Sequence, residues 1–420
     1  MNNVWLPYVL FMLMCCMVVS CGSSHENNEH KGMNHKTAAQ ILGDTNYKAI
    51  CYGGYRTTSR DSQPSVQQIK DDIKILQALG IKVLRTYNTQ YAEVKNLLQA
   101  IAELQQQDST LEMYVMLGTW MDCEGAWTNT PNHEKENETA NAAEIHRAVQ
   151  LANQYPQLVK IISVGNEAMV RWATSYYVKA EIILKWVNYL QRLKNEKLLP
   201  PDIWITSSDN YASWGGGDYM YHTGELKKLY NAVDYVSIHT YPMHDTHYNP
   251  VFWLLKPNEN KLTHEVKIDS LMQRSIQYAQ AQYHHVVKYM KSIGVNKPIH
   301  IGETGWASQS DGYYGNEGSN ACDEYKAALY YQGIRTWTNR EKITCFYFEA
   351  FDEKWKDAQH PNGSENHFGV FTSDGKAKYA IWDKVDEGVF KQLTRDGHPV
   401  VKTFNGNKQE LLKQVRLPRY

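Results

Sequence analysis

The feature that most constrains this chain is a regular alternation of two kinds of segment between residues 48 and 352. Short apolar runs, rich in β-branched and aromatic residues, alternate with longer segments in which apolar residues recur with the period of an α-helix. The strand-like runs are residues 48–55, 82–88, 112–120, 159–167, 203–210, 233–242, 297–306 and 342–352. This alternation is typical of parallel strands joined by helices, and eight is the number of strands that closes a barrel.

The helical segments support the same fold class. Residues 65–80, "SVQQIKDDIKILQALG", place their apolar residues on one helical face and end at Gly80. A doubly wound open sheet is the alternative, but the first strand is followed by "CYGGYR" and not by G-x-G-x-x-G. We therefore predict an α/β fold of the (β/α)8 TIM-barrel type, as one domain over residues 47–420 with a short C-terminal extension.

The N-terminal residues have a different character. Residues 1–20, "MNNVWLPYVLFMLMCCMVVS", are uncharged and mostly apolar, which is typical of a secretory signal. The stretch Val18–Cys21 resembles a bacterial lipobox, so we expect a lipid anchor on Cys21, attachment to a membrane of the cell envelope, and a flexible tether over residues 21–46. An uncleaved anchor or spanning segment is the alternative.

Charge and cysteine content narrow the possible partners. Lys and Arg total 44 against 45 for Asp and Glu, so the net charge of −1 gives no basic face for nucleic acid and favours a neutral partner. The chain has 12 Trp and 29 Tyr, rings that either stack on sugars or pack in the core. Cys51 and Cys345 lie in apolar strands, so we expect them to be buried thiols. Cys123 and Cys322 are either free or joined to one another by a disulfide.

Two of the strand-like runs end in a carboxylate. "VKIISVGNEA" delivers Glu167 at the end of the fourth strand, and "KPIHIGETGW" delivers Glu303 at the end of the seventh. In a closed barrel the carboxyl ends of all strands form one rim, and these two strands lie across it from one another. The other polar and aromatic residues at strand ends are Tyr52, Arg56, Arg85, Tyr87, Trp120, Asn166, His239, Tyr241, Trp306, Glu349, Phe351, Asp352, Glu353 and Lys356.

Two carboxylates that face one another are the usual catalytic groups of a glycosidase. A separation of about 5–5.5 Å lets one attack the anomeric carbon while the other protonates the leaving oxygen, and about 6.5–9.5 Å leaves room for a water and implies inversion. A single strand-terminal acid is more often a solvated cap or the partner of an Arg. The pair at these two strands favours catalysis.

Longer motifs carry a family resemblance. "VGNEA" and "IGETGW" resemble the acid/base and nucleophile motifs of glycoside hydrolase family 17, the β-1,3-glucanases. "ICYGGY", "RTYN", "HTYP", "FEAFDEKWK" and "NHFGVFTSDGKAKY" resemble other segments of that family in the same order, so the likeness covers residues 48–390. The resemblance implies a (β/α)8 barrel that hydrolyses β-1,3-glucan with retention of configuration and needs no cofactor.

The resemblance also implies roles for individual residues. Glu167 corresponds to the general acid/base and Glu303 to the nucleophile, with Asn166 holding the 2-hydroxyl of the sugar under attack. Glu353 and Lys356 correspond to an auxiliary acid and lysine, and we expect the Lys356 charge to keep Glu303 ionised. The expected substrate-binding residues are Tyr52, Arg85, Tyr87, Trp120, Tyr241, Trp306 and Phe351. Core packing is an equal alternative for each aromatic ring.

Three functions stay open at this point: an endo-β-1,3-glucanase, a β-1,3-glucan transglycosylase acting at the same site, and a non-catalytic glycan-binding lipoprotein. The presence of both glutamates argues against the third. The segment "HTYPMHDTHY" offers His239, His244, His247 and Asp245 as metal ligands, but solvated or hydrogen-bonded histidines fit it better, so we expect no metal. We expect the protein to be a monomer.

Overall fold

The strands close into a barrel in which every neighbouring pair is parallel. The computed structural model describes residues 36–419, which lie within one compact unit, His35–Tyr420. The barrel strands are β1 (Lys48–Cys51), β2 (Ile81–Arg85), β3 (Tyr114–Thr119), β6 (Val159–Asn166), β7 (Trp204–Asn210), β8 (Val236–His239), β9 (Ile299–Thr304) and β10 (Cys345–Tyr347). The predicted (β/α)8 barrel is confirmed.

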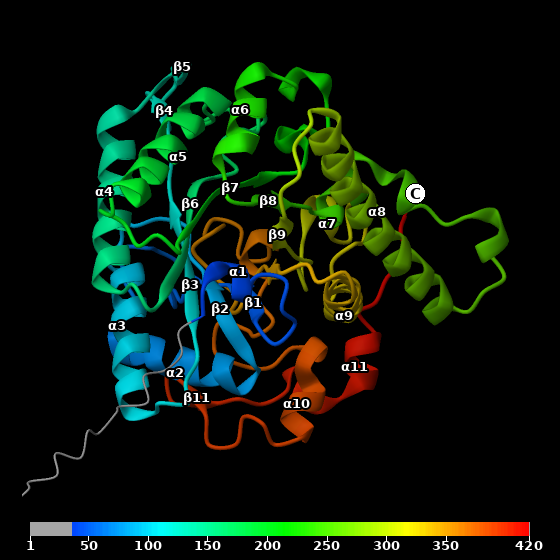
Figure 1. Ribbon diagram of the computed structural model, residues 1–420. Helices are drawn as coiled ribbons and strands as arrows, with labels where there is room; N and C mark the ends of the chain where they lie inside the picture. The colour runs from blue at the N-terminus through cyan, green and yellow to red at the C-terminus, as the bar shows by residue number, and fades with distance from the viewer. Residues whose placement is uncertain (1–35, 420) are drawn as a thin grey trace, which may run out of the picture. The chain divides into compact units, whose positions relative to one another are not determined.

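Helices surround the strands on the outside of the barrel (Figure 1). They are α2 (Val66–Ala78), α3 (Ala92–Gln107), α4 (Glu138–Gln154), α5 (Ala180–Asn195), α6 (Gly224–Ala232), α8 (His264–Ser292) and α9 (Glu324–Arg340). In α2 the Ser65 hydroxyl accepts from the Gln68 amide at 3.2 Å, and the Gln68 side chain accepts from the Ser65 amide at 3.0 Å. This reciprocal cap fixes where the helix begins. Ile69, Ile73 and Leu76 then turn to the core, as their spacing predicted.

Ordered structure begins earlier than the predicted tether allows. The short helix α1 (Ala38–Ile41) lies within residues 21–46, and Ala38 and Ile41 are fully buried. This part of the predicted tether therefore belongs to the domain, because its apolar side chains pack in the core. Residues 1–35, with the predicted signal and Cys21, lie outside the described residues.

The C-terminal extension packs against the barrel. It contains α10 (Trp382–Asp386), β11 (Thr394–Arg395), β12 (His398–Pro399) and α11 (Lys408–Leu412). Arg395 is fully buried, and its Nε lies 2.9 Å from the Oδ1 of Asp72 on α2. A buried ion pair of this kind ties the end of the chain to the first outer helix.

Two secondary-structure elements on the loops that follow barrel strands were not predicted. A hairpin of β4 (Cys123–Glu124) and β5 (Asn132–Glu136) lies between β3 and α4, and α7 (Pro242–Tyr248) follows β8. Both lie on the side of the barrel where the strands end. Within residues 36–419, none of the helices has the length and apolar composition needed to cross a bilayer.

Candidate active site

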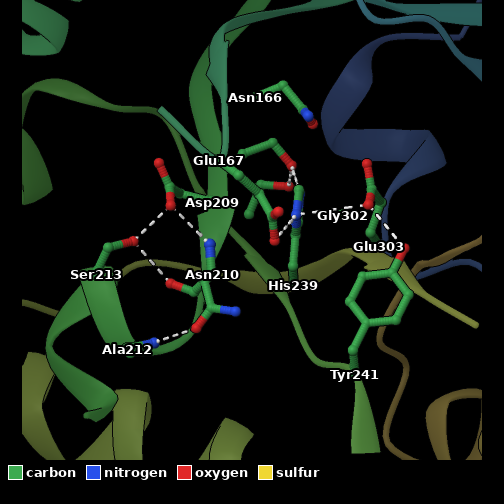
Figure 2. A network of polar contacts seen from close by, with 12 residues as sticks. Asn166, Glu167, Asp209, Asn210, Ala212, Ser213, His239, Tyr241, Gly302 and Glu303 are labelled. Carbon is green, nitrogen blue, oxygen red and sulfur yellow. Dashed lines mark hydrogen bonds and ion pairs between the residues drawn. The ribbon is translucent and has the colours of Figure 1, made fainter. Parts of the chain in front are cut away.

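Glu167 and Glu303 face one another across a histidine (Figure 2). The Nδ1 atom of His239 lies 3.1 Å from Oε1 of Glu167 and 3.7 Å from Oε2 of Glu303. Since both distances start from one atom, the two carboxylate oxygens are at most about 6.8 Å apart. That upper limit admits the separation of about 5–5.5 Å found in retaining glycosidases and excludes most of the range of about 6.5–9.5 Å found in inverting ones.

Glu303 belongs to β9 and is held as an anion. Arg85 donates to Oε1, and the Tyr241 hydroxyl donates to Oε2 at 2.8 Å. Burial alone would raise the pKa of Glu303, but the nearby His239 and Arg85 outweigh burial and lower that pKa below its usual value. An ionised carboxylate is the form that attacks an anomeric carbon.

Arg85 also connects the two acidic strand ends. Its Nη1 donates to the Gly302 carbonyl at 3.0 Å, and its Nη2 donates to Oδ1 of Asn166 at 2.6 Å. The planar guanidinium presents its donors in a fixed fork, so it sets the position of Asn166 and of Glu303 together. Arg85 is therefore a central positioning group of the site.

His239 is fully buried and fixed from behind. Its Nε2 lies 2.8 Å from the Ser208 hydroxyl, which lies 2.8 Å from the Ser237 hydroxyl. A Cβ at Gly302 would lie 2.2 Å from both hydroxyl oxygens, so only glycine fits beside this pair. The serine pair thus holds the imidazole between the two glutamates.

The turn that carries Glu167 has its own support. Glu167 has a φ of +45°, a left-handed conformation that few non-glycine residues adopt, and its amide donates to the Ser208 carbonyl at 3.0 Å. Asp209 on β7 accepts from the Met169 amide at 2.7 Å. It also accepts from the Ser213 hydroxyl at 2.7 Å (Figure 2). Burial raises the pKa of Asp209 to about 6. Sequence patterns did not single out Asp209, because it lies inside a strand and precedes no motif.

Lys356 does not hold Glu303, contrary to the prediction. Its Nζ lies 2.6 Å from Oε2 of Glu349 and 3.2 Å from Oε2 of Glu353. Burial raises the pKa of Glu349, and the Lys356 charge opposes that rise. The cation on Glu303 is Arg85, because the lysine is occupied by two buried acids of its own strand end.

The seven predicted substrate-binding residues separate into two groups. Arg85, Tyr87, Trp120 and Tyr241 lie at the ends of β2, β3 and β8, and all but Arg85 are partly exposed. The Arg85 guanidinium lies 4.8 Å from the Tyr87 ring centre. These four side chains border the two glutamates or the strand ends that carry them.

The other three predicted residues do not reach the site. Tyr52 is 1% exposed and donates to Oδ2 of Asp72 at 2.9 Å. Trp306 is buried and donates to the Ala321 carbonyl at 2.9 Å. Phe351 is buried in a stack with Phe371. Their rings pack in the core, so these predictions of sugar contact are wrong.

The histidine-rich segment after β8 does not converge. His239 lies between the glutamates, the His244 ring stacks on Tyr241, and the His247 ring stacks on Tyr313. Within residues 36–419 no group of three His, Cys, Asp or Glu side chains is placed to hold a metal ion.

The four cysteines among the described residues are free. Cys51 and Cys345 are buried, as predicted, and Cys123 and Cys322 are not paired with one another. The Cys322 sulfur instead lies 3.5 Å from the sulfur of Met243.

Residues 49–369 match the model of the BtgE/BtgC glycoside hydrolase domain. The chain belongs to this glycoside hydrolase family. An endo-laminarinase from Formosa Hel1_33_131 is 58% identical, with a TM-score of 0.90, and the match covers 91% of this chain and 98% of that one. The predicted resemblance to the β-1,3-glucanases of family 17 is confirmed.

A more distant solved structure shares the fold. The glycoside hydrolase family 17 β-1,3-glucanosyltransferase from Rhizomucor miehei is 17% identical with a TM-score of 0.56, over 80% of this chain and 97% of that one. A glucan 1,3-β-glucosidase from Candida albicans is 36% identical over 84 residues. That match covers 19% of this chain. It covers 25% of the length of the curated relative, so the chain matches only part of that protein.

Proposed function

We propose that this member of the family is a retaining endo-β-1,3-glucanase that acts on laminarin-type glucans. The observation that carries the proposal is the pair of carboxyl groups held within about 6.8 Å by one histidine, in different electrostatic surroundings. Glu303 is buried against Arg85 and Tyr241, whereas the Glu167 side chain is 16% exposed.

The first chemical step assigns one role to each glutamate. The Glu303 carboxylate attacks the anomeric carbon, and the bond to the leaving oxygen breaks as Glu167 gives that oxygen its proton. Arg85 and Tyr241 keep Glu303 ionised and aimed before the attack. Asn166, held by Arg85, is placed to hydrogen-bond the sugar hydroxyl next to the reacting carbon.

The second step releases the sugar. Glu167 takes a proton from a water, the water oxygen attacks the anomeric carbon, and the ester bond to Glu303 breaks. His239 contacts both carboxyl groups through Nδ1, so it holds their spacing in both steps.

The substrate assignment draws on the relatives. The Formosa protein is an endo-laminarinase, and this chain is similar to it along nearly all of both lengths. The near-neutral net charge of −1 suits an uncharged polysaccharide.

The test is a product ladder from laminarin and from defined laminari-oligosaccharides. Endo-hydrolysis gives a range of shorter products from the start, and the new reducing ends have the β-configuration. Longer products would show that the enzyme is a transglycosylase, as the name of the Rhizomucor relative states for that protein. An unchanged ladder with retained binding would indicate a glycan-binding protein and contradict the proposal.

We also propose that the protein is a lipid-anchored monomer of the cell envelope. The support is the apolar stretch before Cys21 and the resemblance of Val18–Cys21 to a lipobox. Labelling with a radioactive fatty acid tests the anchor, and Cys21→Ala is expected to remove the label and release the protein from the membrane fraction. Light scattering of the released protein tests the monomer.

A further inference from the structure

Three aromatic rings form a cluster on loops next to the end of β6, the strand that precedes Glu167. Trp120 follows β3 directly, and Thr119 of β3 pairs with Val164 near the end of β6. Trp120 lies 5.0 Å from Tyr176, a residue of the loop between β6 and α5, and Trp127 of the β4–β5 hairpin lies 5.0 Å from the same tyrosine. The cluster therefore borders the strand end that delivers Glu167.

Trp127 is exposed and yet firmly held. Its side chain is 62% exposed, although its ring stacks on Tyr176 with 22° between the planes. The indole Nε1 donates to Oδ1 of Asp122 at 3.3 Å, and the Trp127 amide donates to the Ser175 carbonyl at 2.9 Å. Its φ of +64° is a left-handed conformation that bulky residues rarely adopt.

These contacts fix the position of the Trp127 indole at the surface. A large apolar side chain is normally buried, and an unfavourable backbone conformation persists only where surrounding contacts enforce it. Here the contacts hold an indole at the surface in one orientation. A flat, pre-positioned ring is suited to stack on the apolar face of a sugar.

The position of the cluster decides which part of a glucan it would meet. The nucleophile and the leaving oxygen lie on opposite sides of the anomeric carbon, and the acid contacts the leaving oxygen. Residues that surround Glu167 therefore face the part of the chain that leaves first. We infer that Trp127, supported by Trp120 and Tyr176, forms a binding site for glucosyl units on the leaving-group side of the cleaved bond.

This inference rests on the proposed function and deepens it. A glucan bound at the same site after the first step has a hydroxyl next to the glycosyl ester on Glu303. That hydroxyl oxygen attacks the anomeric carbon, the ester bond breaks, and Glu167 takes the hydroxyl proton. The cluster would therefore also set how often a sugar, and not water, completes the reaction.

The test compares a substrate that has glucosyl units on the leaving-group side with one that has none there. Laminarihexaose fills both sides of the site, whereas β-laminaribiosyl fluoride has a fluoride ion as its leaving group and no sugar there. Trp127→Ala is expected to lower kcat/KM for laminarihexaose about 3- to 10-fold, which corresponds to the free energy of one aromatic contact. The kcat/KM for the fluoride is expected to stay within about two-fold of the wild-type value. Trp127→Phe is expected to recover most of the loss.

Trp172→Ala is the matched control for an exposed ring that no other ring holds in place, because Trp172 is also 62% exposed, lies in the same loop as Tyr176 and, within the described chain, pairs with no other ring. It is expected to keep both rates. Equal losses on both substrates for Trp127→Ala, no loss on either, or an equal selective loss for Trp172→Ala would overturn the inference. A wild-type protein that cleaves neither compound would instead contradict the proposed function itself, and the inference with it.

Discussion

The surroundings of Glu303 and of Glu167 differ although the two side chains are chemically identical. Glu303 is the penultimate residue of β9, its side chain is 7% exposed, and it contacts Arg85, Tyr241 and His239. Glu167 lies just past the end of β6 in a left-handed conformation, and its side chain is 16% exposed. One carboxyl group sits in a rigid strand among donors, and the other on a turn with a path to solvent.

This difference in surroundings explains how two glutamates in one barrel can have different chemical roles. A carboxylate surrounded by positive charge and donors stays ionised and suits nucleophilic attack. A carboxyl group with few donors and access to solvent can gain and lose a proton during each turnover. In the proposed mechanism, the environment of each carboxyl group, more than the side chain itself, separates the nucleophile from the acid/base.

The largest expected effect comes from Glu303→Gln. The amide cannot form the glycosyl ester, so we expect kcat on laminarin to fall by about 10⁴-fold or more while the substrate still binds. Turnover measured by reducing ends, with binding measured by calorimetry, checks this. Residual turnover near the wild-type rate would show that the two environments have been assigned the wrong roles.

Glu167→Gln is expected to act more selectively. Loss of the general acid should lower kcat on laminarin by about 10²- to 10⁴-fold. An activated aryl laminaribioside needs little proton donation, so its first step should be much less affected, which a pre-steady-state burst of the aryl alcohol would reveal. Equal losses on both substrates would contradict the acid/base role.

Replacement of the cation beside Glu303 sharpens the comparison through pH. Arg85 helps to lower the pKa of Glu303, so in Arg85→Gln that pKa rises and the ionised form is lost at a higher pH. The acid limb of kcat/KM should move to higher pH, with a loss of about ten-fold at acidic pH. Lys356→Gln, at the separate Glu349 cluster, should leave the acid limb in place. A shift in Lys356→Gln and none in Arg85→Gln would restore the original assignment of the lysine.

The smallest effect concerns a residue that the structure removes from the site. Tyr52→Phe deletes one buried hydrogen bond to Asp72, so we expect the free energy of unfolding to fall by about 1 kcal/mol. Because Tyr52 does not reach the cleft, kcat/KM on laminarin should stay within about two-fold. Urea unfolding and steady-state kinetics test both parts, and a selective rise in KM would return Tyr52 to the substrate site.

These residues also show how far sequence patterns reach. The period of the apolar residues predicted the strands, the barrel and the rim on which Glu167 and Glu303 meet, since burial on both faces of a parallel sheet leaves a strong pattern. Arg85 and Tyr241 were found because strand ends in a barrel point to one rim.

The remaining features depend on packing that has no local pattern. Tyr52, Trp306 and Phe351 follow strands just as Tyr87 and Tyr241 do, but at the end of a strand the alternation of faces breaks down, so spacing does not separate rim from core. Hydrogen bonds across strands, such as the one that the Met169 amide donates to Asp209, join residues far apart in sequence. Packing between distant strands also determines that Arg85, and not Lys356, is the partner of Glu303.

The measurement that tests the central assignment most directly is covalent trapping. A 2-deoxy-2-fluoro-β-laminaribiosyl fluoride slows release of the sugar more than its attachment, so the glycosyl-enzyme accumulates and can be digested and sequenced by mass spectrometry. We predict one added laminaribiosyl group, on the peptide that contains Glu303, and none on that peptide in Glu303→Gln. A label on Glu167 or on another carboxylate would contradict the account.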